Sequence, residues 1–126
     1  MQKGHKMIRI ETIPHKDQRY NTVGDWQFLG DDLIVRVSDM ESEQGLYEFL
    51  VGIHELIEAV LCKAYGISQE EVDKFDMEHL DFEGEPGNLP DAPYYRQHLL
   101  ATVIERILSD ELDIDWNEYE EAIENL

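Results

Sequence analysis

The residues best suited to chemistry are concentrated in five letters, HELIE, residues 54 to 58. His54 and Glu58 are four residues apart, so on a helix their side chains lie one turn apart and point at a common spot. Imidazole nitrogen and carboxylate oxygen are both zinc ligands. Glu55 is turned away from this pair by roughly 75° to 100° on a helix of about 100° per residue, which suits a base rather than a ligand. The spacing therefore predicts two ligands of a metal site and a general base, Glu55, that acts on a water.

The surroundings of this pair indicate that Glu58 must have a partner. Apolar residues recur every three to four positions from Leu46 to Ala64, and the resulting apolar arc runs past His54 and Glu58 on both sides. A carboxylate inside such an arc must be hydrogen-bonded, protonated or bound to a metal, because burying it alone is prohibitively costly. Two interpretations therefore remain: a metal site, and a buried pair of hydrogen-bonded side chains without a metal.

Further ligands are expected from the stretch YYRQHLLATVIERILSDEL, residues 94 to 112. Its polar stripe consists of His98, Thr102, Glu105 and Ser109, opposite an apolar stripe of Leu100, Val103, Ile104 and Ile107. His98 and Glu105 are two turns apart, so both can face the HELIE helix, and they are the predicted third and fourth metal ligands. Asp76 and His79 are weaker candidates. Zinc is the expected metal, and manganese, iron or magnesium are the alternatives because carboxylates make the site harder.

The elements that must position these residues follow from two periodicities. The stretches MIRIETI (7–13) and WQFLGDDLIVRV (26–37) are rich in β-branched residues, and the second contains a Gly-Asp-Asp turn, so a small antiparallel sheet is predicted over residues 1–40. After Val37 the period becomes about 3.6 residues, which predicts helices over residues 41–126. The predicted fold is α+β, with three to four helices after the sheet, in a single domain.

Helix-capping residues, glycines and prolines divide the helical part into separate helices. The HELIE helix should end at Gly66, and a capping box of Ser68 and Glu71 should open a shorter helix toward His79. The run DFEGEPGNLPDAP then interrupts helical structure, and Pro93 suits the first turn of the next helix. The tail DIDWNEYEEAIENL is predicted to dock through Trp116, Tyr119 and Ile123.

Charge limits the classes of partner. The formal net charge is −19, and residues 69–126 carry 18 acidic residues against 3 basic ones. This field repels phosphate backbones and anionic lipids, so neither direct nucleic-acid binding nor membrane binding is expected. No apolar run approaches about 18 residues, and the N-terminal stretch MQKGHKMIRI lacks the apolar segment of a signal peptide. With Cys62 as the single cysteine, a cytoplasmic location is predicted.

The stretches HELIEAVLC, VDKFD, GEPGNLPDAPYYRQH, LATVIER and DIDW, within about residues 50 to 120, resemble small uncharacterised proteins of bacteriophages and prophages. The order of strands, an HExx-bearing helix and a further helix also resembles the core of zincin metallopeptidases. Zincins carry His where this chain has Glu58. The resemblance implies His54 as a metal ligand and Glu55 as the catalytic base, within a zincin-like core.

The leading functional prediction is a zinc-dependent hydrolase, with His54, Glu58 and His98 as ligands and an amide bond in a peptide or small molecule as the target. A second prediction is a magnesium-dependent nucleoside triphosphate pyrophosphohydrolase that uses Glu55, Glu58 and later acids. A third is a non-enzymatic acidic protein that mimics nucleic acid. Substrate and oligomeric state do not follow from the sequence.

Overall fold

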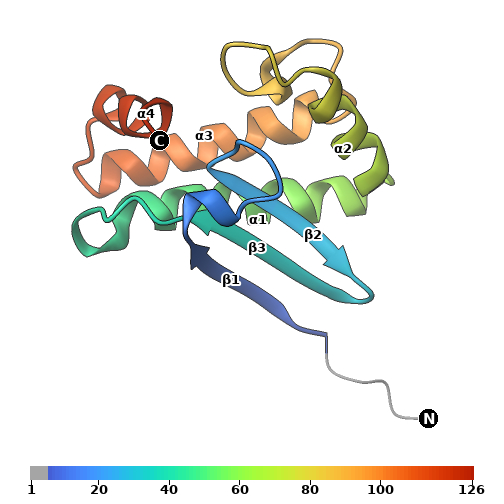
Figure 1. The fold of residues 1–126 in the computed structure, drawn as a ribbon, viewed down its shortest axis with the longest axis horizontal. Helices are drawn as coiled ribbons and strands as arrows, with labels where there is room; N and C mark the ends of the chain where they lie inside the picture. The colour runs from blue at the N-terminus through green and yellow to red at the C-terminus, as the bar shows by residue number, and fades with distance from the viewer. Residues whose placement is uncertain (1–5) are drawn as a thin grey trace.

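The computed structural model describes residues 6–126 and has a three-stranded sheet followed by four helices (Figure 1), so the predicted α+β class is confirmed. Residues 1–5 of the N-terminal stretch discussed above lie outside the described residues. Within residues 6–126, no helix is long and apolar enough to cross a membrane. The strands are β1 (Ile8–Ile13), β2 (Gly24–Leu29) and β3 (Asp32–Ser38), and the helices are α1 (Leu46–Ala64), α2 (Gln69–Glu78), α3 (Tyr95–Glu111) and α4 (Trp116–Glu124).

The sheet has the strand order β1-β3-β2 and mixed direction. The hairpin of β2 and β3 is antiparallel and turns at Gly30, whose φ of +63° lies in the left-handed region that favours glycine. The prediction of an antiparallel sheet is wrong for β1, which pairs in parallel with β3. The long polar connection after β1 lets β2 form the far edge, so that β3, the most apolar strand, takes the buried central position.

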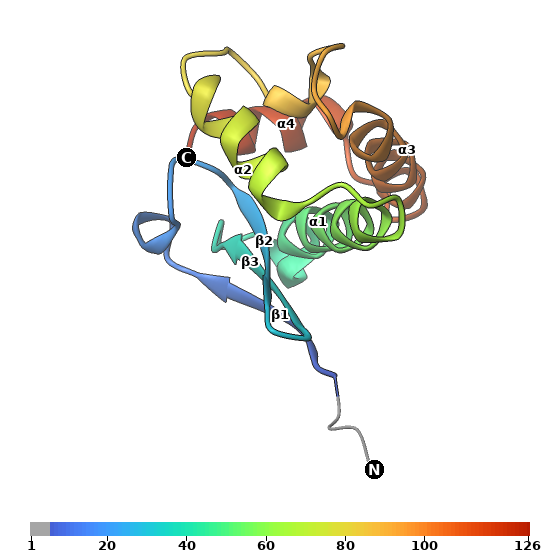
Figure 2. The ribbon, with the colours of Figure 1, turned by 90° about the vertical axis from the view of Figure 1, so that its right-hand side faces the viewer.

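Helices α1 and α3 lie side by side, and α1 also packs on the sheet (Figures 1 and 2). They run antiparallel, because His54 meets Glu105 near the C-terminal end of α3 while Glu58 meets His98 near its start. Helix α2 begins at the predicted capping box of Ser68 and Glu71. The sheet therefore supports α1 from one side, and α3 supplies the opposing wall of the site.

The predicted docking of the C-terminal tail is confirmed. The side chain of Tyr119 in α4 is fully buried, and Trp116 and Ile123 pack against the same core. That core is formed by the inner face of the sheet and the inner sides of the helices. Its buried members include Trp26, Leu33, Val35, Val37, Leu50, Val51, Ala59, Cys62, Val72 and Tyr94.

Candidate metal site

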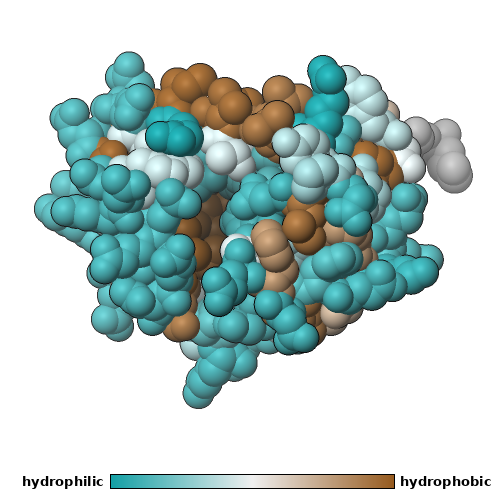
Figure 3. All heavy atoms as spheres, turned by 90° about the horizontal axis from the view of Figure 1, so that it is seen from above, coloured by the Kyte–Doolittle hydropathy of each residue, from teal (hydrophilic) through white to brown (hydrophobic). Residues whose placement is uncertain are grey.

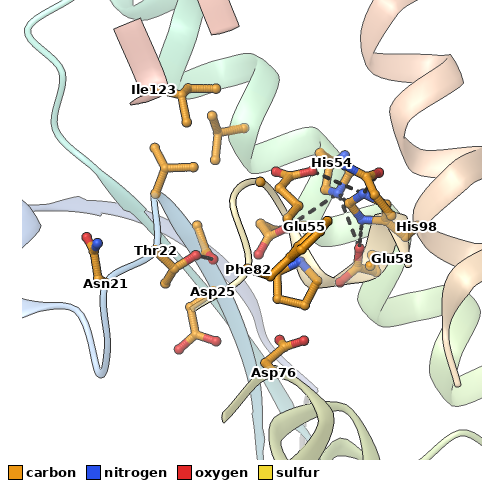
Figure 4. A pocket seen from close by; sticks show the side chains of 18 of the residues that line it. Asn21, Thr22, Asp25, His54, Glu55, Glu58, Asp76, Phe82, His98 and Ile123 are labelled. Atoms are coloured by element: carbon orange, nitrogen blue, oxygen red, sulfur yellow. Dashed lines mark hydrogen bonds and ion pairs between the residues drawn. The ribbon is translucent and has the colours of Figure 1, made fainter. Parts of the chain in front are cut away.

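Three side chains from α1 and α3 converge on one point (Figure 4). Nε2 of His54 lies 3.2 Å from Oε2 of Glu58 and 3.2 Å from Nδ1 of His98, and the last two atoms are 2.8 Å apart. All three residues are only 4% to 5% exposed. Zinc ligands at about 2.0 to 2.1 Å in tetrahedral geometry are roughly 3.3 Å apart, so these three converging atoms nearly form one face of such a tetrahedron.

Each histidine of this group has a second ring nitrogen that does not join the converging atoms, here called the outer nitrogen. The partners of the two outer nitrogens decide where the imidazole protons lie. Nδ1 of His54 is 2.8 Å from Oε1 of Glu105. Nε2 of His98 is 3.0 Å from Oδ1 of Asn88 and 3.0 Å from Oε2 of Glu85. Because these oxygens accept hydrogen bonds, both outer nitrogens donate. In neutral rings the inner nitrogens then carry lone pairs, so the three converging atoms are all acceptors. Such a group suits a cation.

Protons are the other cations that such a group can hold. Burial lowers the pKa of His98, but hydrogen bonds to Glu58 and Glu85 outweigh burial and raise the pKa to about 9. The pKa of His54 is likewise raised well above its usual value, because hydrogen bonds to Glu105 and Glu58 outweigh burial. Two charged rings with nitrogens 3.2 Å apart repel each other. A divalent ion that displaces these protons would remove the repulsion.

Glu58 is held ionised and oriented. Burial raises its pKa, but hydrogen bonds from His54 and His98 outweigh burial and lower it to about 2. The indole Nε1–H of Trp26 donates to Oε1 of Glu58 over 3.0 Å. Oε2 is thereby left to face the two histidines, which is the arrangement that a monodentate metal ligand requires.

Two further contacts fix the histidine rings. The hydroxyl of Tyr119 donates to Oε2 of Glu105, whose other oxygen binds His54. The backbone at Gly87 packs directly on the ring of His98: a Cβ at this position would lie 2.6 Å from Cγ of His98. Only glycine allows this close approach, so the short turn Pro86–Asn88 holds one histidine while α4 holds the other.

Glu55 lies next to the three converging atoms without joining them. Its Oε2 is 3.8 Å from Nε2 of His54, and its side chain is 13% exposed. Burial and the nearby charge of Glu58 raise the pKa of Glu55 well above its usual value. Gly24 at the start of β2 brings the backbone against this side chain, where a Cβ would come within 2.8 Å of Cγ of Glu55. The carboxyl group is thus held at the wall of a cavity (Figure 4).

This cavity has a volume of about 700 Å³ and opens between β2, α2, the loop before α3 and the C-terminal helix. Ten carboxylate residues line it, and among residues 6–126 no Lys or Arg does. Phe82, Ile123 and Leu126 contribute apolar surface. A carbonyl compound could therefore reach the converging atoms and Glu55 from the cavity, whereas a polyanion would be repelled.

The other residues proposed from sequence lie outside the three-residue group. Glu105 contacts the outer nitrogen of His54. Asp76 accepts hydrogen bonds from the hydroxyls of Tyr94 and Tyr20, and Nδ1 of His79 bonds to the backbone oxygen of Phe75. The sequence reasoning missed the site contacts of four residues: Trp26, Glu85, Asn88 and Tyr119. Comparisons with protein-family models, curated proteins and solved structures find no match to this chain.

Proposed function

We propose that this chain is a metal-dependent hydrolase that cleaves an amide bond in a peptide or small molecule. His54, Glu58 and His98 would hold a divalent transition-metal ion, with zinc as the first candidate. The observation that carries the proposal is the convergence of three atoms that are all acceptors when both imidazole rings are neutral, because the partners of the other two ring nitrogens hold the remaining imidazole protons. Two nitrogens and one oxygen at this spacing suit zinc.

The metal ion, Glu55 and strand β2 would each have a different role in the reaction. When bound, the ion supplies a Lewis acid that polarises a carbonyl and lowers the pKa of a water. Glu55 would accept a proton from the attacking water and return it to the leaving nitrogen, a role that its raised pKa suits. Strand β2 is an edge of the sheet and lines the cavity, so an extended substrate could lie beside it.

The first experiment is elemental analysis of the purified protein, before and after reconstitution with zinc, manganese or iron. We expect one transition-metal ion per chain, and cleavage of an amide substrate from a fluorogenic panel that is lost with a chelator and regained with zinc. If no stoichiometric metal binds even after reconstitution, the proposal fails. If metal binds without hydrolysis across the panel, the site stands and the proposed activity fails.

Replacing Glu105 by glutamine should weaken zinc binding about 10- to 100-fold, as is typical when the partner of a ligating histidine is changed. The substitution keeps the shape of the side chain but removes the charge that binds Nδ1 of His54. Calorimetric titration of the metal-free protein would measure the change. Asp110→Asn, which alters an exposed acid on the same helix, is the matched control. Equal affinities in both variants would mean that Glu105 does not position His54.

The two other functions predicted from the sequence draw less support from the site. Histidine nitrogens are poor magnesium ligands, and no described Lys or Arg lines the cavity to receive a triphosphate. Stabilisation by nucleotide with magnesium, and none by zinc, would nevertheless favour the pyrophosphohydrolase. Mimicry of nucleic acid rests on charge alone, and it predicts that His54→Ala and Glu55→Gln leave function intact.

A further inference from the structure

The outer side of α1, and of α3 as far as Ser109, is apolar and free of acids. Six side chains there are between 38% and 57% exposed: Val60, Leu99, Leu100, Val103, Ile104 and Ile107. The chain has 29 acidic residues, yet those in α1 and in α3 before Asp110 are Glu48, Glu55, Glu58 and Glu105, all turned inward. Hydrophobic residues gather along the upper edge of Figure 3. This edge corresponds to the right-hand side of Figure 2, where α1 and α3 lie. We call this surface the α1/α3 face.

The distribution of polar and apolar residues on helix α3 is the reverse of that on an ordinary surface helix. Its polar residues His98, Glu105 and Ser109 are buried, the first two of them in the site, while apolar residues such as Leu100, Val103 and Ile107 meet solvent. At roughly 80 Å² for each half-exposed side chain, the α1/α3 face amounts to about 500 Å² per chain, or about 1,000 Å² for two copies. The area per chain is at the upper end of the largest apolar patch of a typical monomer, and the area for two copies reaches about the minimum expected of a biological interface.

The exposed stripe of α3 is complementary to itself. Arg96 stands at its start, Glu111 at its end, and apolar residues lie between them at helical spacing. If two copies of α3 pack antiparallel about a two-fold axis between Val103 and Ile104, the charged ends and the central apolar residues of the stripe meet suitable partners. Arg96 then faces Glu111 of the second copy, Leu100 faces Ile107, and Val103 faces Ile104.

We propose that the chain forms a two-fold symmetric dimer through the α1/α3 face, with α3 packed antiparallel against α3 of the second copy. Closed dimers use one surface twice, so an interface must match itself under rotation. Two chains of net charge −19 repel each other over most of their surfaces. The α1/α3 face is an exception, because it has basic and acidic residues at opposite ends. The cavity lies on the other side of α3, so both sites would stay open. The proposal does not depend on the metal.

Sedimentation equilibrium over a range of concentrations is the first test. We expect the wild-type chain to sediment at twice its monomer mass. Val103→Glu, which places two carboxylates at the axis, should raise the dissociation constant at least about 100-fold, as for buried unpaired charges. Leu29→Glu makes the same change at an exposed apolar residue of the β2–β3 hairpin and should leave the dimer intact. Circular dichroism of each variant checks that it is folded.

A charge exchange tests the antiparallel arrangement itself. Arg96→Glu and Glu111→Arg should each weaken the dimer about tenfold, and the double variant should restore it, because each single change sets like charges against each other. Lys74→Glu and Glu118→Arg, at exposed positions of α2 and α4, are the matched controls. A monomer at all concentrations, a dimer that survives Val103→Glu, or a double variant no tighter than the single ones overturns the proposal. So does a monomer that co-sediments with phosphatidylcholine vesicles, which would assign the face to lipid.

Discussion

Replacing His54 by alanine is expected to lower the zinc affinity by more than about 100-fold, because changing only the partner of a ligating histidine already costs about 10- to 100-fold. His54 contributes one of the three converging atoms, and no other described His, Cys, Asp or Glu joins that group. Wild-type protein should gain about 2.7 kcal/mol in its free energy of unfolding when free zinc exceeds the dissociation constant 100-fold. The variant should gain almost none. Calorimetric titration and thermal unfolding measure both quantities.

His79→Ala is the matched control for this prediction. His79 lines the same cavity, but its Nδ1 is bound to the backbone of Phe75, so its removal should leave zinc affinity unchanged. Circular dichroism of the metal-free proteins checks that His54→Ala is folded, since His54 is buried. Retention of wild-type zinc affinity by a folded His54→Ala protein would exclude this metal site.

Replacing Glu55 by glutamine is expected to reduce hydrolysis about 10²- to 10⁴-fold while zinc still binds with an affinity near that of the wild type. Glutamine has nearly the shape of glutamate but cannot accept a proton from the attacking water. Zinc binding should persist because the Glu55 carboxylate is 3.8 Å from Nε2 of His54 and does not belong to the converging group. Initial rates on any substrate found in the panel, together with bound zinc per chain, measure the two effects.

Glu83→Gln serves as the comparison for Glu55, since Glu83 also lines the cavity but lies in the exposed loop before α3. Its rates should match those of the wild type. An equal loss in both variants would point to the negative potential of the cavity rather than to a base. If Glu55→Gln releases the zinc instead, Glu55 is a ligand and the proposed division of roles is wrong.

The helices were predictable because their signals are local. Spacing along the HELIE stretch and the capping box at Ser68 and Glu71 are properties of a few consecutive residues, and the structure confirms both helices. The direction of β1 could not be predicted in this way. Pairing of Ile8–Ile13 with β3 joins residues 25 apart in sequence, and strand periodicity is the same in parallel and antiparallel pairs.

The same distinction applies to the site. His98 was predictable because it shares a helical stripe with Glu105 and Ser109. Tyr119 was predicted only to dock the C-terminal tail, and Trp26 was given no role in the site, although buried indole N–H and phenol O–H groups need hydrogen-bond partners. That need was the available signal, but the partners Glu58 and Glu105 are 32 and 14 residues away. Glu85 and Asn88 lie in an irregular loop where no periodicity operates.

The hydrogen bond from Trp26 to Glu58 makes the site sensitive to the register in which β2 pairs with β3. Trp26 pairs with Val35 across the β2–β3 hairpin, and successive side chains of a strand point to opposite faces. A slip of one residue would turn the indole to the other face of the sheet and leave Oε1 of Glu58 without its donor. An ion that binds only the native arrangement would therefore select the correctly registered hairpin over its slipped alternatives during folding.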